Sequence, residues 1–221
     1  MALPINTFFD ENYYRLQNPD VYAAILRGEL ANGYTHFIQN GAREGRSPSQ
    51  VFNTSYYLSL YPDVAAAVAN GSLRSGYDHF IQYGAREGRY PSPLFNQIYY
   101  LNRYPDVASA VSNGIIRSGF DHFLQFGALE NRDPSPLFIS TLYTSQNADA
   151  AGAVATGQIS AFEHFLVYGQ DDNRPGVPAN KFNIELDYSL DTNGFFADPV
   201  RRGLLQTAAN IWQSYIQDEF D

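Results

Sequence analysis

The sequence predicts an all-α protein: a tandem array of four three-helix repeats, followed by a short strand-plus-helix segment. The first observation behind this prediction is a constant spacing. Two aromatic positions return every 43 residues, one as Phe9, Phe52, Phe95 and Phe138 and the other as Tyr14, Tyr57, Tyr100 and Tyr143. The second observation is that helix-start signals recur at fixed places within each period. Such repetition is typical of stacked units, which we place at residues 8–50, 51–93, 94–136 and 137–178.

The first helix of the second repeat should begin just after Asn53. The Asn53 side chain can accept a hydrogen bond from a free backbone N–H in the first turn, which makes it a helix N-cap. Phe52 precedes the cap and Tyr57 follows it by four residues, which is the spacing of a hydrophobic staple.

The second helix should begin at Pro62, because proline fits the first helical turn, where its missing N–H is not needed. Asp63 adds a negative charge at the positive end of the helix dipole. Residues 65–67 are alanines that extend the helix. Gly71 can then end it in a left-handed conformation.

The third helix should begin at Ser75, with Asp78 three residues later completing a capping box. The same pattern recurs as Ser118 with Asp121 and Ser160 with Glu163. Tyr77, Phe80 and Ile81 have the spacing of an apolar helix face, and Gly84 should end the helix. Capping explains these acids, so a pair of catalytic carboxylates is not needed to account for them.

One repeat cannot bury its aromatic side chains alone, so neighbouring repeats must stack against each other. The fourth repeat departs most from the pattern. Ala148 replaces the proline, Ile139 replaces the cap residue and Ala161 replaces a glycine. A terminal repeat is expected to diverge in this way.

A different kind of segment follows at residues 179–221. Apolar residues alternate with mostly polar ones over positions 182–190, which predicts a strand with one buried face. Asp198 and Pro199 then predict a helix start. Because a lone strand and helix bury too little surface to fold alone, this segment is either an incomplete domain, a strand that pairs with another protein, or an element docked on the last repeat.

The composition narrows the function classes. Acidic residues outnumber basic ones by 23 to 14, for a net charge of −9, which disfavours nucleic acid as a partner. The chain has no cysteine, which excludes disulfides and thiolate metal sites. Neither a membrane span nor a classical N-terminal secretion signal is evident. We expect an extracellular or cell-surface protein exported by another route; the composition also suits the cytoplasm.

The strings Tyr-Pro-Asp-Val and Asp-His-Phe-Ile-Gln-Tyr-Gly-Ala-Arg-Glu-Gly-Arg, within residues 56–92, carry a resemblance. The repeat resembles one found in large bacterial secreted and surface proteins, which often also contain calcium-binding glycine-rich repeats. Related units are appended to some bacterial glycosyltransferases. The resemblance covers about 170 residues and implies no settled activity for the repeat.

The tail carries a second, shorter resemblance through residues 187–191 and 208–212. It looks like the opening strand and first helix of a bacterial metzincin-like zinc metalloprotease domain. The zinc motif His-Glu-x-x-His is absent from the 221 residues. If the resemblance holds, the protease site lies beyond Asp221, and no ligand can be assigned here.

All four histidines occupy one slot of the repeat: His36, His79, His122 and His164. A zinc site needs three or four converging ligands, whereas each repeat offers one histidine. We therefore expect the histidines to be structural, hydrogen-bonded within or between repeats.

An arginine closes each repeat, as Arg46, Arg89, Arg132 and Arg174. We expect each guanidinium to bind the last carbonyls of the preceding helix or to bridge to the next repeat.

Most tyrosines occupy core slots, but Tyr22, Tyr61 and Tyr90 are the better candidates for an exposed face. Exposed aromatic rings suit carbohydrate. We expect no cofactor. The alternative is a calcium ion at residues 171–173 or 187–193, although neither stretch has the spacing of an EF-hand loop.

We therefore expect a non-catalytic recognition or scaffold module of a bacterial extracellular or cell-surface protein, with a protein or a polysaccharide as partner. The alternatives are the N-terminal targeting or regulatory part of a secreted zinc metalloprotease, and a carbohydrate-binding module.

Overall fold

The structure is a computed structural model that describes residues 9–157, 159–169, 174, 176, 186–188 and 191–215. The regular elements in these residues are helices, and three helices recur in each of the four repeats. The prediction of an all-α array is thus confirmed. The chain divides into two compact units, residues 1–122 and 123–221.

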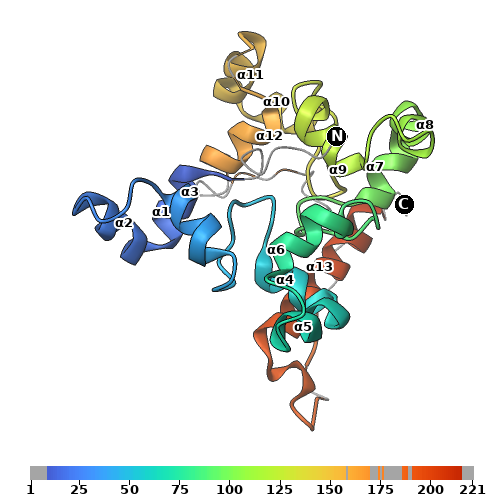
Figure 1. Cartoon of the computed structure of the whole chain (residues 1–221). Coiled ribbons are helices and arrows are strands. Elements are labelled where there is room, and N and C mark those ends of the chain that lie inside the picture. The colour runs from blue at the N-terminus through green and yellow to red at the C-terminus, as the bar shows by residue number, and fades with distance from the viewer. Residues whose placement is uncertain are drawn as a thin grey trace. The chain divides into compact units, whose positions relative to one another are not determined.

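The helices follow the same order in each repeat (Figure 1). The first helices are α1 (Glu11–Gln17), α4 (Thr54–Leu60), α7 (Gln97–Arg103) and α10 (Ser140–Gln146). The second are α2 (Pro19–Leu26), α5 (Pro62–Ala69), α8 (Pro105–Ser112) and α11 (Ala148–Ala155). The third are α3 (Gly33–His36), α6 (Gly76–His79), α9 (Gly119–His122) and α12 (Ala161–His164).

Each third helix runs directly into a π-helical turn. These turns are η2 (Phe37–Gly41), η3 (Phe80–Gly84), η4 (Phe123–Gly127) and η5 (Phe165–Gly169). The wider turn is visible in the backbone, where the N–H of Ala85 bonds to the carbonyl of Phe80, five residues earlier, at 3.0 Å. Periodicity alone did not predict this change of helix type.

The predicted helix starts are confirmed. Asn53 accepts the backbone N–H of Tyr56 at 2.9 Å, and Pro62 occupies the first turn of α5. Gly71 ends that helix with a left-handed φ of +79°. Ser75 caps α6 by accepting the N–H of Asp78 at 3.0 Å.

The prediction that each capping box is complete needs correction. Ser160 and Glu163 make both bonds of the box. Asp121 instead bonds through both carboxylate oxygens to Arg117, at 2.5 and 2.7 Å. The basic residue that precedes the cap residue thus competes for the carboxylate.

Neighbouring repeats share aromatic contacts within each unit. In the first unit, Phe37 of η2 packs edge-on against Tyr77 of the second repeat, with ring centroids 4.9 Å apart. Phe80 packs in the same way on Phe120, at 5.3 Å. These four rings are fully buried, and each contributes roughly 1.5–3 kcal/mol relative to an exposed ring. The repeats therefore bury their aromatic side chains against one another, as the stacking argument requires.

An arginine from one repeat also bonds to the π turn of the repeat before it. Arg74 donates to the carbonyl of Ile38, and Arg117 donates to the carbonyl of Ile81, each at 2.5 Å. The fourth repeat has Ile159 at the equivalent position.

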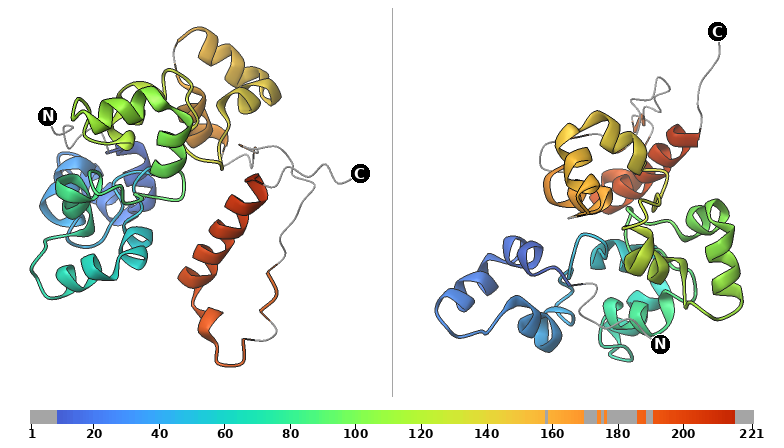
Figure 2. Two further views of the ribbon diagram at one scale, coloured as in Figure 1. Left: turned by 90° about the vertical axis from the view of Figure 1, so that its right-hand side faces the viewer. Right: turned by 90° about the horizontal axis from the view of Figure 1, so that it is seen from above.

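The tail contains a short 3-10 turn, η6 (Phe195–Ala197), and the long helix α13 (Pro199–Tyr215), drawn in red in Figure 2. The helix begins at Pro199, as predicted. Most of the predicted strand at 182–190 lies outside the described residues, and residues 186–188, which are described, are not in a strand. In the part of the chain that is described, no helix is long and apolar enough to cross a membrane.

Candidate functional site

The four histidines face inward and form one hydrogen bond per repeat with the recurring tyrosine. The Tyr57 hydroxyl lies 2.8 Å from Nδ1 of His79, and the Tyr100 hydroxyl lies 2.9 Å from Nδ1 of His122. The pairs Tyr14–His36 and Tyr143–His164 have the same contact at 3.0 Å. Each pair links the first helix of a repeat to its third.

The glycine that ends each π turn makes room for this hydrogen bond. A Cβ atom on Gly84 would lie 2.2 Å from the Tyr57 hydroxyl oxygen, and one on Gly41 would lie 2.0 Å from that of Tyr14. Both distances are far below a van der Waals contact. Gly84 does end the helix, as the sequence suggests, and its lack of a Cβ atom makes room for the Tyr57 hydroxyl.

The repeat-closing arginines pair differently from the sequence expectation. Arg89 donates to both carboxylate oxygens of Asp63, at 2.9 and 2.7 Å, and to Glu87 at 2.6 Å. The corrected partner is thus an acid at the start of the second helix of the same repeat. This acid lies in the first turn of α5, at the positive end of the helix dipole, where a negative charge is favourable.

The other repeats have related ion pairs. Arg46 bonds to Asp20 at 2.8 and 2.7 Å and to Glu44 at 2.6 Å. Arg174 bonds to Asp149 at 2.6 Å, and Arg132 bonds to Glu130 at 2.5 Å.

These ion pairs lie beside the second nitrogen of the histidine. Nε2 of His164 is 3.6 Å from Oδ2 of Asp149, and Nε2 of His36 is 4.0 Å from Oε2 of Glu44. In the second repeat, burial lowers the pKa of His79, and the positive charge of Arg89 lowers it further. The hydrogen bond from Arg89 lowers the pKa of Asp63 to about 2. The acid is therefore ionised at neutral pH, and the histidine there favours the neutral form.

The expected exposed tyrosines are only partly exposed in the structure. Tyr22 is 43% exposed, as predicted. Tyr61 and Tyr90 are half-buried, and the Tyr61 hydroxyl accepts the backbone N–H of Tyr90 at 2.7 Å. Arg89 also lies over the Tyr61 ring, 4.7 Å from its centre. These two residues are therefore partners in the same structure rather than a free face.

A different aromatic slot is exposed, and sequence reasoning missed it. Tyr83, Phe126 and Tyr168 are 51%, 48% and 52% exposed. Each lies four residues after the histidine of its repeat, in the π turn. Tyr83 contacts the His79 ring at 5.7 Å between centres, and Tyr168 contacts the His164 ring at 4.9 Å. A signal was available, since an aromatic residue recurs at this slot in three repeats, while Asn40 fills it in the first.

We call this recurring set the aromatic–ion-pair cluster. In the second repeat it consists of Tyr83, His79, Asp63, Glu87 and Arg89. In the fourth repeat it consists of Tyr168, His164, Asp149 and Arg174. In the third repeat the exposed ring is Phe126 and the ion pair is that of Arg132 with Glu130. In the second and fourth repeats the exposed ring packs on a buried histidine, and in the fourth repeat the other ring nitrogen of that histidine lies near the acid of the ion pair.

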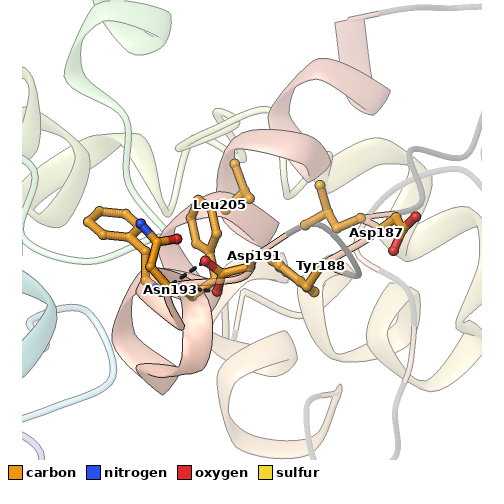
Figure 3. Close-up of a pocket in the computed structure, with 8 residues that line it drawn as sticks. Asp187, Tyr188, Asp191, Asn193 and Leu205 are labelled. Carbon is orange, nitrogen blue, oxygen red and sulfur yellow. Dashed lines mark hydrogen bonds between the residues drawn. The ribbon is translucent and has the colours of Figure 1, made fainter.

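The tail has a separate cavity of about 350 Å³, lined by Leu186, Asp187, Tyr188, Asp191, Asn193, Phe195, Phe196 and Leu205 (Figure 3). Asp191 accepts the backbone N–H groups of Phe195 and Phe196, at 2.9 and 2.7 Å. Its carboxylate thus caps η6.

The calcium alternatives fall partly on these residues. Asp191 belongs to the stretch 187–193, and the other stretch, 171–173, lies outside the described residues. Among the described residues, no group of three or more His, Cys, Asp or Glu side chains is placed to hold a metal ion.

Comparison of the chain with protein-family models, with curated proteins and with solved structures finds no match.

Proposed function

We propose that this chain is a non-catalytic recognition module of a bacterial extracellular or cell-surface protein, and that the aromatic–ion-pair clusters are its binding surface. The observation that carries the proposal is the recurrence of an exposed ring at one slot in repeats two, three and four. Single exposed apolar residues are common on protein surfaces and need no explanation. An aromatic residue kept exposed at one slot in three repeats offers a large, rigid apolar face for contact with a ligand.

The inward-facing residues support the same proposal. The Nδ1 atoms of the histidines are engaged by tyrosine hydroxyls, and the arginines are engaged by acids. These groups hold the repeat together, whereas the ring at the exposed slot is about half exposed in three repeats and is not part of the buried core.

Binding of fluorescently labelled chain to a panel of bacterial cells tests the proposal. The wild-type chain should bind to cells of at least one species. A triple variant, with Tyr83→Ala, Phe126→Ala and Tyr168→Ala, should lose most of this binding. The matched control replaces three other exposed apolar residues, Leu16→Ala, Ile98→Ala and Ile115→Ala, and should bind as the wild type does. Equal binding by the triple variant and the wild type would contradict the proposal.

A second candidate function rests on the resemblance of the tail. In this alternative the repeats are the N-terminal targeting or regulatory part of a secreted zinc metalloprotease, whose catalytic site lies beyond residue 221. The reading frame downstream tests it. A His-Glu-x-x-His motif followed by a third histidine would support this candidate, and a downstream sequence without the motif would remove it.

A further inference from the structure

The exposed ring of the cluster packs on a histidine on one side, and about half of the residue is open to solvent. In the second repeat, the His79 ring holds Tyr83 from within, and the backbone N–H of Glu87 bonds to the Tyr83 carbonyl at 3.0 Å. The backbone of Tyr83 is thus bonded to the turn that carries Glu87 and Arg89, and its ring packs on His79. A ring held in this way loses little conformational freedom when a ligand stacks on it.

The charged groups beside the ring keep free acceptor positions. The Asp63 side chain is 62% exposed and that of Glu87 is 43% exposed, although both bond to Arg89. A carboxylate offers about four lone-pair sites, so each can accept further hydrogen bonds from a ligand. The ion pairs fix the direction in which these acceptors point.

The chemistry of the cluster selects among ligands. Two carboxylates flank one guanidinium, and the chain has a net charge of −9, so a polyanion would be repelled. A protein partner would require a broad patch with an apolar centre, whereas in the fourth repeat the Tyr168 ring packs on His164, whose Nε2 atom lies 3.6 Å from the Asp149 carboxylate. A neutral sugar fits better, because its C–H face packs on an aromatic ring and its hydroxyls donate to carboxylates.

We propose that the aromatic–ion-pair clusters bind neutral polysaccharide, with one sugar-stacking ring in each of repeats two, three and four. This inference rests on the recognition function proposed above and names its ligand class. The rings are Tyr83, Phe126 and Tyr168. The sugar stacks on the ring, and its hydroxyl groups donate to the carboxylates of the adjacent ion pair.

The first repeat provides an internal comparison. It has the Tyr14–His36 bond and the Arg46 ion pair with Asp20 and Glu44, but Asn40 stands where the other repeats have a ring. The first repeat therefore has the other parts of the cluster and lacks only the aromatic ring on which a sugar would stack. Asn40→Tyr should add a fourth binding ring without any change in the core.

Affinity electrophoresis of the full chain in native gels tests the inference. The gels contain laminarin, dextran or galactomannan as neutral polysaccharides, or alginate as an anionic one. At least one neutral polysaccharide should retard the wild-type chain. Each single Ala variant at the three rings should weaken binding about 2- to 12-fold, and Asn40→Tyr should strengthen it. The control variant at Leu16, Ile98 and Ile115 should migrate like the wild type.

Retardation by alginate alone, or none by any neutral polysaccharide, would overturn the inference. So would unchanged retardation of the triple variant. The cell-binding assay separates this failure from that of the recognition function. If binding to cells depends on the three rings but is removed by protease treatment of the cells and not by periodate, the recognition function stands and the sugar inference falls.

Discussion

Replacing Gly84 with alanine should destabilise the second repeat, because the new Cβ atom would lie 2.2 Å from the Tyr57 hydroxyl oxygen. Tyr57 is fully buried, so its ring cannot simply turn out to solvent. The tyrosine must withdraw and lose its 2.8 Å contact with His79. An unsatisfied buried polar group costs about 1–3 kcal/mol and overpacking costs a similar amount, for a total of about 2–6 kcal/mol.

Urea denaturation followed by circular dichroism measures this loss. The matched control is Gly152→Ala in α11, where nothing lies within 4 Å of the added Cβ atom. That change should instead stabilise the chain, by about 0.5–1 kcal/mol, because alanine is the better helix former.

A double-mutant cycle with Tyr57→Phe isolates the clash. Without the hydroxyl, the closest remaining side-chain atoms to the new methyl group are Cδ2 of Phe80 at 3.1 Å and Cζ of residue 57 at 3.3 Å. Gly84→Ala should therefore cost at least about 1 kcal/mol less in the Tyr57→Phe background. An equal cost in both backgrounds, or a neutral effect in the wild type, would refute the reasoning.

Three further predictions concern other contacts. Arg117→Met should lower the free energy of unfolding in urea by about 3–5 kcal/mol, because it leaves Asp121, whose side chain is 2% exposed, without its partner. Arg74→Met, at a pair that is far more exposed, should lower it by about 1 kcal/mol or less. Similar losses for the two variants would contradict this account. Ile139→Asn should stabilise α10 by about 0.5–2 kcal/mol, since its N-cap residue makes no side-chain bond; a loss in thermal midpoint would count against it. The lowered pKa of His79 means that the unfolded chain takes up the proton first as pH falls. The contribution of His79 to the free energy of unfolding is complete above its ordinary pKa of 6.5, and it is lost as the pH falls from there through the lowered pKa of the folded chain. The free energy of unfolding should therefore fall less between pH 7.5 and 5.5 in His79→Gln than in the wild type.

Much of the fold was predictable because its signals are local. The bond from the Tyr56 N–H to the Asn53 side chain spans three residues, and Pro62 acts within its own turn. The 43-residue spacing added one long-range conclusion, since aromatic rings at a constant interval can be buried only between neighbouring repeats. The ring contact of Phe37 with Tyr77 bears this out.

The candidate site was harder to predict. The exposed slot of Tyr83, Phe126 and Tyr168 lies in the π turn, where an ordinary helical period assigns residues to the wrong face. Tyr61 looked exposed in the sequence, yet it lies between Arg89 and the backbone of Tyr90. Neither neighbour is close to it along the chain.

The sequence by itself determined where each helix begins, how many repeats there are and that they stack, since caps act within one turn and the spacing is written in the chain. Only the tertiary structure decided which groups meet across larger separations: Tyr57 with His79, 22 residues apart, and Arg89 with Asp63, 26 residues apart. Those partners depend on how three short helices cross, and a glycine without a Cβ atom, at the end of a π turn, sets how closely the first and third can approach.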